Sequence, residues 1–373
     1  MSRTLVVTND FPTRRGGIES FVFALVSRLP PDEVVVYTAS MPGSADFDAG
    51  LAFPVVRDPT SMLLPTPLVA RRVRQALRAY GCDRVLFGAA APLGLLAGDL
   101  RAAGARRVVA MTHGHETWWA QVPGTRRALR RIGAGCDVLT FVSGWCRNWI
   151  ASALSPGAAA RMQRLAPGVD VARFAPGAGG AAVRTRLGLP ADAPVAVCTA
   201  RMVARKGQDT LVRAWPRVLD AVPSARLLLV GDGPARAAVE RLAAGLDGSV
   251  VLAGSVPWEE VPAYVDAGDV FAMPCRTRLG GLEPEALGIV CLEAAAAGLP
   301  VLVGDSGGAS ETVRHGDTGW VVDPHNPVAV AARLAPLLAD RSAAAAMGSR
   351  GRNWVSAEWT WDASVDVLER LLS

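Results

Sequence analysis

The chain has 373 residues, half of them hydrophobic, which is enough for two domains of ordinary size, each with a buried core. Its six cysteines lie far apart without a Cys-x-x-Cys pair, which argues against a zinc site and a disulfide framework. The longest uncharged stretch, 85–98, is shorter than the roughly 20 apolar residues that a membrane-spanning helix needs. We therefore expect a cytoplasmic protein without a membrane span.

The charge is distributed unevenly along the chain. Residues 1–170 hold 20 arginines against 12 acidic residues, whereas residues 171–373 hold 19 basic residues against 22 acidic ones. The excess gathers in two stretches where spacings of three and four place side chains on one helical face. These arginines are Arg71, Arg72, Arg74, Arg78, Arg126, Arg127, Arg130 and Arg131. They form either a solvated surface or a face attracted to an anionic membrane. Nucleic acid is not expected, because no recognised binding module accompanies the charge.

Short apolar runs alternate with helical patterns through the first half of the chain. The predicted strands are 4–8, 34–38, 84–87, 107–111 and 137–142, and the clearest helices are 17–29 and 66–80. This alternation is typical of a parallel sheet with crossover helices. A loop rich in proline, glycine and alanine, 166–180, is interpreted as a linker.

The same alternation restarts after the linker. The predicted strands are 195–200, 226–230, 249–253, 270–273, 300–303 and 319–322, with a helix at 213–222. The sequence therefore predicts an α/β protein of two doubly wound Rossmann-like domains, which bind ligands at the carboxyl ends of both sheets, in an interdomain cleft. We expect an N-terminal domain over 1–168, a C-terminal domain over 169–353, and a helix over 354–373 that packs back on the first domain.

Glycine-rich loops follow several of the predicted strands. Gly16 and Gly17 stand between the first strand and a helix whose N-terminal amides favour an anion. A tight turn without a ligand is an equal interpretation of this pair. The runs 230–234 and 305–309 also follow strands, but neither has the Gly-x-Gly-x-x-Gly spacing of a dinucleotide site.

Lys206 is the single lysine in a chain with 38 arginines. A composition that has shifted almost completely to arginine keeps a lysine where a compact ammonium is needed and a planar guanidinium does not serve. Chance survival is the alternative. Lys206 and Arg201 both follow the strand that opens the second domain, so both are expected to reach a diphosphate.

Two glutamates stand eight residues apart, at Glu285 and Glu293. If a helix begins at Gly288, Glu293 lies in its second turn and Glu285 in the preceding loop, so the two carboxylates address different parts of one ligand. The amides of Gly288, Ile289 and Val290 would then face an anion at the helix start.

These motifs resemble the retaining family 4 glycosyltransferases, which have the GT-B fold. The Glu285–Glu293 spacing is similar to the family signature, and the likeness extends over nearly the whole chain. The matching segments are 16–17, Arg201, 206–207, 230–234, 298–301, 307–308, Glu311 and 316–319. The stretches 8–12, 112–116 and 276–290 are most similar to family members that mannosylate a phosphatidylinositol lipid. The resemblance implies GDP-mannose as donor and a monomannosylated phosphatidylinositol as acceptor. Ala286 stands where the family usually has glycine.

The resemblance also implies roles for single residues. Glu285 and His113 would contact the transferred sugar, and Glu293 the ribose hydroxyls. Arg201 and Lys206 would bind the diphosphate and the leaving oxygen, and Gly16 with Gly17 the distal phosphate. Asp10 and His115 are the candidates for the acceptor. No metal or other cofactor is required by this resemblance.

Three alternatives stay open at this stage. The chain could be a sugar-nucleotide epimerase, or a noncatalytic nucleotide-binding module that has no need of Glu285 and His113. It could also be a hexosyltransferase that acts on another lipid or on a soluble cyclitol. With the phosphatidylinositol acceptor, we expect peripheral association with an anionic surface, the inner face of the plasma membrane.

Overall fold

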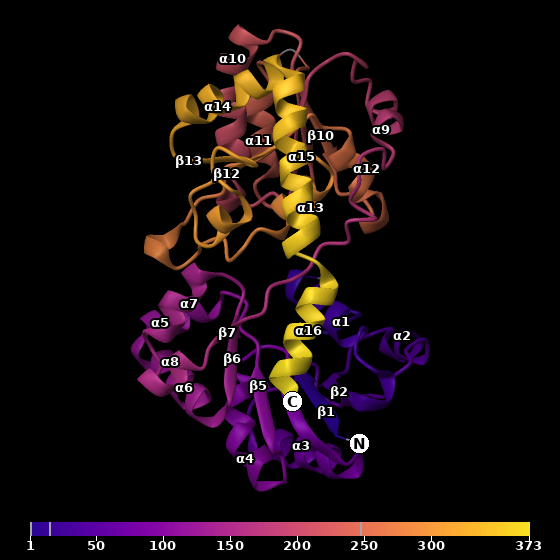
Figure 1. Cartoon of the computed structure of the whole chain (residues 1–373), viewed down its shortest axis with the longest axis vertical. Coiled ribbons are helices and arrows are strands. Elements are labelled where there is room, and N and C mark those ends of the chain that lie inside the picture. The colour runs from indigo at the N-terminus through magenta and orange to yellow at the C-terminus, as the bar shows by residue number, and fades with distance from the viewer. Residues whose placement is uncertain (1, 15, 247) are drawn as a thin grey trace. The chain divides into compact units, whose positions relative to one another are not determined.

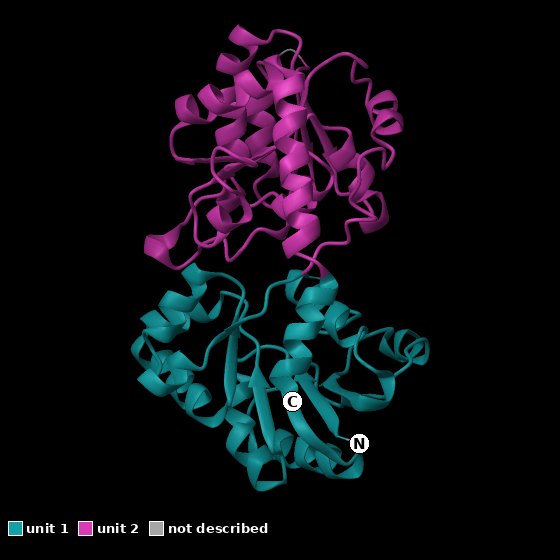
Figure 2. Ribbon diagram, viewed as in Figure 1, with its two compact units in different colours: residues 1–167, 361–373 teal, residues 168–360 magenta. Residues whose placement is uncertain are grey.

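The computed structural model describes residues 2–14, 16–246 and 248–373, which form two compact units (Figure 2). Unit 1 comprises residues 1–167 and 361–373, and unit 2 comprises residues 168–360. Each unit contains one β-sheet with helices packed on it (Figure 1). The α/β class that we expected is confirmed.

The sheet of unit 1 is parallel, with the strand order β3-β2-β1-β4-β5-β6-β7. Its strands are β1 (Arg3–Thr8), β2 (Val34–Ala39), β3 (Val55–Asp58), β4 (Cys82–Phe87), β5 (Arg107–Ala110), β6 (Val138–Phe141) and β7 (Gln163–Arg164). Its helices are α1 (Gly17–Val26), η1 (Pro31–Glu33), α2 (Ser44–Ala49), α3 (Pro67–Ala79), η2 (Leu93–Leu96), α4 (Ala97–Ala102), α5 (Glu116–Gln121), α6 (Pro123–Gly135), α7 (Gly144–Ala151), α8 (Pro156–Ala160) and α16 (Trp361–Leu372).

The sheet of unit 2 is also parallel, in the order β10-β9-β8-β11-β12-β13. Its strands are β8 (Val195–Thr199), β9 (Arg226–Val230), β10 (Val250–Gly254), β11 (Val270–Met273), β12 (Val301–Gly304) and β13 (Gly319–Val322). Its helices are α9 (Gly180–Arg186), η3 (Ala204–Lys206), α10 (Gln208–Ala221), α11 (Arg236–Ala243), η4 (Trp258–Glu260), α12 (Val261–Asp266), η5 (Leu279–Gly281), α13 (Ile289–Ala296), η6 (Ala309–Thr312), α14 (Pro327–Ala339) and α15 (Arg341–Glu358).

Each sheet reverses its strand order once. In unit 1 the chain proceeds from β1 to β3 in one direction and resumes with β4 on the other side of β1. In unit 2 the same reversal lies between β8 and β11. Ligands of doubly wound sheets bind outside the carboxyl ends of the strands at such a reversal. By this rule the loops after β1, β4, β8 and β11 are the candidate ligand-binding loops of the two units.

All strands predicted from the sequence are present, but two further strands were missed. β3 contains only two apolar residues and lies at the edge of its sheet, and its Arg57 and Asp58 bind the neighbouring Asp48 and Tyr37 side chains. β7 has only two residues, both exposed. Neither strand produces a hydrophobic run, because neither is buried on both faces.

The expected helix over 354–373 is wrong as one element. Residues 354–358 are the end of α15, which belongs to unit 2, and α16 begins at Trp361 in unit 1. Thr360 breaks the helix because it forms an isolated parallel bridge with Val169. α16 packs on unit 1, where Arg107 Nε donates to the Leu371 carbonyl at 2.7 Å. The helix predicted at 213–222 also begins earlier, at Gln208, directly after Gly207.

No helix of the described residues is both long enough and apolar enough to cross a membrane.

Candidate active site

Two glycines bring the loops of unit 2 together at its strand reversal. Gly207 has a φ of +78°, and a Cβ placed on it would lie 2.0 Å from the Pro274 carbonyl oxygen. Gly307 has a φ of +58°, and a Cβ there would lie 2.1 Å from the Glu285 carbonyl oxygen. Only glycine fits both the left-handed conformation and the close approach. The loop after β8 therefore packs against the loop after β11, and the loop after β12 supports Glu285.

Lys206 and Glu285 form an ion pair at this junction. Lys206 Nζ lies 2.7 Å from Glu285 Oε2, and the two side chains are only 12% and 9% exposed. Arg205 Nε lies 3.7 Å from the same oxygen. The Glu285 backbone is also bound, because its N–H donates to Ser306 Oγ at 3.2 Å and its carbonyl accepts from Gly308 at 2.9 Å. A compact ammonium thus neutralises a carboxylate whose backbone is bound on both sides.

Arg201 and the start of α13 lie at the same edge of the sheet. Arg201 directly follows Ala200 at the end of β8 and is exposed, so its guanidinium faces solvent. α13 begins at Ile289 after Gly288, whose φ is +82°. The first amides of a helix have no carbonyl partner within the helix, which makes Gly288, Ile289 and Val290 donors for an anion. The helix thus begins one residue after Gly288, the start that we assumed from the sequence.

Glu293 lies in the second turn of α13 and is 5% exposed. Among the described residues its Oε2 has no hydrogen-bond partner. Burial raises the pKa of Glu293 to about 7, although the positive charge of Arg173 acts in the opposite direction. A buried carboxyl that lacks a partner is suited to accept hydrogen bonds from a ligand such as a pair of hydroxyl groups.

We expect this buried carboxyl to make the protein less stable as the pH rises. The folded state binds the Glu293 proton more tightly than the unfolded state, so the free energy of unfolding falls between about pH 4.5 and pH 7. The slope is at most about 1.4 kcal/mol per pH unit. Denaturant unfolding of Glu293→Gln and wild type across this range checks it, because only the difference between them isolates Glu293. A constant difference would contradict the burial of this proton.

His113 follows β5 in unit 1 and is 9% exposed. Its Nε2 lies 2.6 Å from the Gly88 carbonyl oxygen, which follows β4. A carbonyl only accepts, so Nε2 carries the proton and Nδ1 is left as an acceptor. Burial lowers the pKa of His113, which keeps the imidazole neutral at physiological pH. The ring of Phe21 from α1 lies edge-on at 5.7 Å.

Several titratable side chains lie around the loop after β1 in the same unit. Burial raises the pKa of Asp10 and the Glu19 carboxylate raises it further, while His115 and Arg14 act in the opposite direction. A Cβ placed on Gly16 would lie 2.3 Å from Glu19 Oε2, so this carboxylate lies against the N-terminus of α1. An anionic ligand bound at Gly16 and Gly17 would have to displace the flexible Glu19 side chain.

The structure thus groups the predicted site residues by unit. In unit 2 it brings Lys206 and Glu285 into contact and places Arg201 and the α13 start at the same sheet edge. In unit 1 it places Asp10, His113 and His115 around the loops after β1 and β5. Arg205 belongs to the charged group of unit 2 and Glu116 to that of unit 1, and we assigned no role to either. Arg205 was hidden among many arginines, and Glu116 has no spacing signal of its own.

One Asp-x-Asp spacing, at Asp46 and Asp48, resembles a metal-binding pattern. Both oxygens of Asp48 accept from the Arg57 guanidinium, at 2.7 and 2.9 Å. Over residues 2–14, 16–246 and 248–373, no cluster of three or more His, Cys, Asp or Glu side chains has the arrangement of a metal site.

Two family models match the chain, one in each half. The model described as Glycosyltransferase Family 4 matches residues 15–173, and the model described as Glycosyl transferases group 1 matches residues 181–354. Among solved structures, Anabaena HepE in complex with UDP aligns with a TM-score of 0.82 and 20% identity over 100% of this chain and 99% of that chain. WaaG, a glycosyltransferase involved in lipopolysaccharide biosynthesis, aligns with a TM-score of 0.69 and 18% identity, over 98% and 99%. The fold is GT-B, as expected, and the class of protein is glycosyltransferase.

Curated relatives are similar over their whole length. The GDP-mannose-dependent α-(1-6)-phosphatidylinositol monomannoside mannosyltransferase of Mycolicibacterium smegmatis is 48% identical over 99% of this chain and 98% of that protein. The corresponding enzyme of Corynebacterium glutamicum, which is named for a monoacylated acceptor, is 43% identical over 99% and 97%. The chain belongs to this family of glycosyltransferases.

Proposed function

We propose that this protein transfers mannose from GDP-mannose to a phosphatidylinositol monomannoside, with retention of the anomeric configuration. The observation that carries the proposal is the buried Lys206–Glu285 ion pair at the strand reversal of unit 2, on the residues that match the family signature. Full-length relatives at 43–48% identity, named for this donor and acceptor, support the same reaction.

Unit 2 binds the donor in this proposal. Lys206, Arg201 and the first amides of α13 bind the diphosphate, and they stabilise the negative charge that develops when the bond from the sugar to the diphosphate breaks. Glu285 and the neutral His113 contact the sugar, whose transition state has oxocarbenium character. Glu293 accepts from the ribose hydroxyls. Fixed cations and amides supply the stabilisation that a metal ion would otherwise provide, so the proposal includes no metal.

The acceptor binds to unit 1, where Asp10 and His115 exchange hydrogen bonds with its polar head group. An acceptor hydroxyl attacks the sugar carbon on the face from which the diphosphate departs. The new bond forms as the old one breaks, and the acceptor proton passes to the departing phosphate oxygen. This front-face course needs no protein nucleophile and retains the configuration.

Transfer of label tests the proposal directly. GDP-mannose and UDP-glucose carrying a label on the sugar are supplied separately to the purified protein, with phosphatidylinositol monomannoside in vesicles. We expect label from GDP-mannose to enter the lipid, in the presence of chelator as well. Label from UDP-glucose in the lipid would show that the donor is not GDP-mannose. Conversion of the nucleotide sugar without an acceptor would favour an epimerase.

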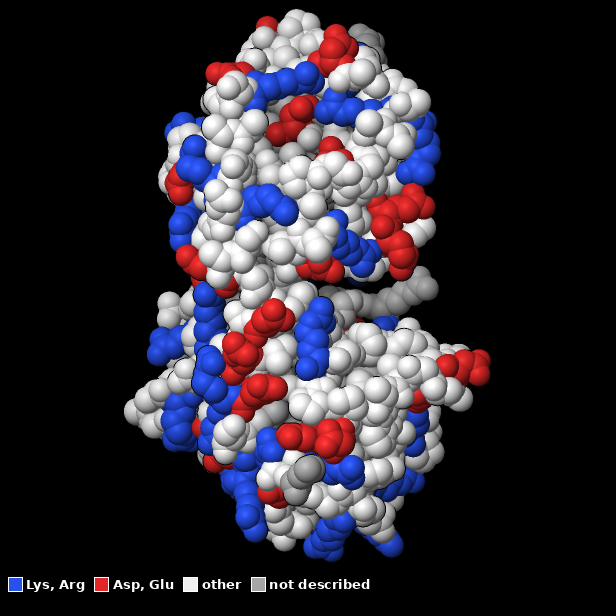
Figure 3. Space-filling view, turned by 45° about the vertical axis from the view of Figure 1, so that its right-hand side comes forward, with Lys and Arg blue, Asp and Glu red and all other residues white. Residues whose placement is uncertain are grey.

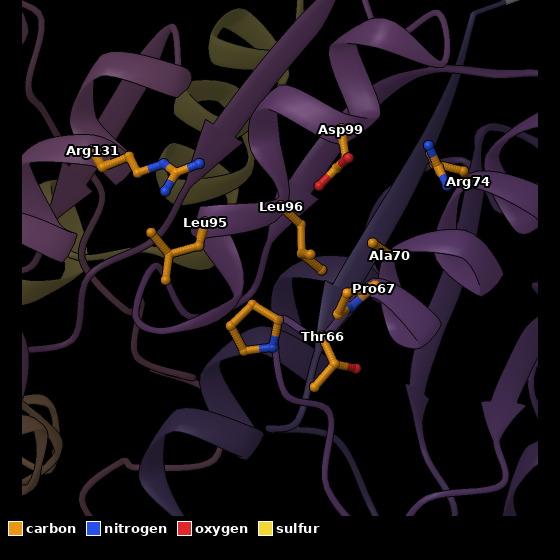
Figure 4. A pocket seen from close by; sticks show the side chains of 9 residues that line it. Thr66, Pro67, Ala70, Arg74, Leu95, Leu96, Asp99 and Arg131 are labelled. Carbon is orange, nitrogen blue, oxygen red and sulfur yellow. The ribbon is translucent and has the colours of Figure 1, made fainter.

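We further propose that a basic face of unit 1 binds an anionic membrane surface. All basic side chains of unit 1 are arginines, and Figure 3 shows basic and acidic side chains side by side on the surface. Arg74 of α3 and Arg131 of α6 line opposite sides of a cavity of about 300 Å³, with Asp99 between them (Figure 4). Within the described part of the chain neither guanidinium has an ion-pair partner. Both are therefore available to a lipid phosphate.

Two of the arginines noted in the sequence have partners inside the unit. Arg72 lies 3.2 Å from the buried Asp58 carboxylate. Arg126 donates to the carbonyls of Ala120, at 2.9 Å, and Ser152, and so ties α6 to the ends of neighbouring helices. These two residues support the fold, and a test of membrane binding should leave them unchanged.

Replacing Arg71, Arg74 and Arg131 by serine should weaken attachment to anionic vesicles. Each basic residue near an anionic surface contributes about 1 kcal/mol, so the triple variant should bind about a hundredfold less at low salt. Raising the ionic strength should weaken the wild type in the same way, because the charges are screened over about 8 Å at physiological salt. Vesicle cosedimentation measures both effects.

The matched control removes three exposed arginines of unit 2, Arg213, Arg217 and Arg241. This variant has the same net charge and should bind vesicles as the wild type does. GDP affinity should be unchanged in both variants. Equal vesicle binding by the two triple variants would show that only net charge matters, and that the face on α3 and α6 is a solvated surface.

A further inference from the structure

Glu116, the first residue of α5, is a fully buried carboxylate beside the two histidines of the loop after β5. It is 0% exposed. Its Oε2 accepts from the backbone N–H groups of His113 and Gly114, at 3.0 and 3.2 Å. Its Oε1 lies 3.3 Å from His115 Nε2 and has no hydrogen-bond partner among the described residues. One carboxylate therefore contacts the backbone of one histidine and the side chain of the other.

Both imidazoles are directed at the same neighbouring loop. His113 Nε2 contacts the Gly88 carbonyl at 2.6 Å, and His115 Nε2 lies 3.5 Å from the Ala91 carbonyl. The loop of Gly88 and Ala91 follows β4, at the strand reversal of unit 1. Glu116 Oε2 accepts from the backbone N–H of His113 at 3.0 Å and so holds the backbone from which the ring reaches this loop. The position of the His113 ring thus depends on the backbone that Glu116 holds.

A buried carboxylate with only two backbone donors is a costly way to close a loop. The same turn could be closed by a serine or asparagine side chain without burying a charge. The negative charge instead faces His115, the side chain nearest to it that can carry a positive charge. Geometry and charge therefore both relate Glu116 to the histidine pair.

We propose that Glu116 is a positioning residue for the transfer reaction, which sets the His113 ring against the sugar and the His115 ring against the acceptor. This inference rests on the proposed function. Glu116 Oε2 fixes the backbone that carries His113, and Glu116 Oε1 orients His115. Glu116 touches neither the donor nor the acceptor.

Two substitutions separate the two contacts. Glu116→Gln keeps an oxygen that accepts from the His113 and Gly114 amides but removes the charge beside His115. Glu116→Ala removes both contacts. We expect kcat to fall about tenfold in the glutamine variant and about a hundredfold in the alanine variant, the loss that a misplacement of about 1 Å produces. The KM for GDP-mannose and the Kd for GDP should be unchanged.

Asp58 provides the matched control. It is also buried in unit 1, and its Oδ1 accepts from the Thr60 backbone at 2.9 Å. Asp58→Asn should lower the melting temperature as the Glu116 variants do and leave kcat unchanged. If Glu116→Ala lowers kcat no more than Asp58→Asn does, Glu116 is structural and the inference is wrong.

A second measurement does not depend on activity. The chain has only four histidines, so nitrogen NMR can resolve the imidazoles. We expect the His113 ring to be protonated at Nε2 in the wild type and to show both tautomers in Glu116→Ala. An unchanged His113 spectrum in Glu116→Ala would overturn the inference. A wild type that transfers no mannose would overturn the proposed function instead, whatever the variants show.

Discussion

Replacing Lys206 by alanine is expected to weaken GDP binding about ten- to a hundredfold. In the proposed function the side chain supplies a charge-assisted contact to the diphosphate, which contributes about 1.5–3 kcal/mol. Lys206→Arg should also bind GDP less well, because a planar guanidinium does not fit where a compact ammonium lies 2.7 Å from Glu285 Oε2. Isothermal calorimetry with GDP measures both variants. Unchanged affinity in Lys206→Ala would contradict the role of this residue at the diphosphate.

The ion pair adds a consequence for stability. Lys206→Ala leaves the Glu285 carboxylate, only 9% exposed, with Arg205 at 3.7 Å as its nearest cation. A buried charge without its partner destabilises a protein, so the variant should unfold at lower denaturant concentration than the wild type. The double variant Lys206→Ala, Glu285→Gln should recover most of that stability while GDP binding stays weak. If the double variant recovered both its stability and its GDP affinity, Lys206 would affect GDP binding only through Glu285.

Much of the fold followed from simple patterns. Buried parallel strands produce short apolar runs, and each such run became a strand of the predicted sheet. The start of α13 was also anticipated to within one residue, because a glycine stands directly before the helix and tolerates the positive φ found there. Edge strand β3 escaped because its residues face polar partners, and the break at Thr360 escaped because it depends on a bridge to the distant Val169.

The candidate site was predictable in its residue types and less so in its contacts. A single lysine among arginines pointed to a position that needs an ammonium. Nothing in the sequence indicates that this ammonium pairs with Glu285, which stands 79 positions further along the chain. That pairing exists because Gly207 and Gly307 allow loops from three strands to approach closely. Arg205 and Glu116 were not predicted as site residues for the same reason, because loop packing decides which side chains they contact.

Replacing Glu285 by glutamine is expected to lower kcat about a hundred- to a thousandfold, the loss measured when one preorganised charge-stabilising group is removed from an active site. The amide keeps the shape of the side chain and its place between the loops after β8 and β12. It loses the negative charge that, in the proposed function, stabilises an oxocarbenium-like sugar. Steady-state transfer from GDP-mannose to the lipid measures kcat.

For the affinity of GDP we expect Glu285→Gln to have no such loss. The Glu285 carboxylate is paired with Lys206, so a diphosphate that binds this ammonium has to compete with it. Removing that charge should leave GDP affinity at the wild-type value or raise it, whereas kcat falls. This expected effect on GDP affinity distinguishes Glu285 from Lys206 and Glu293. Substitution of either of those two residues should weaken GDP binding. A Glu285→Gln variant that binds GDP more weakly than the wild type would mean that the carboxylate orients Lys206 for the diphosphate and that its charge does not compete.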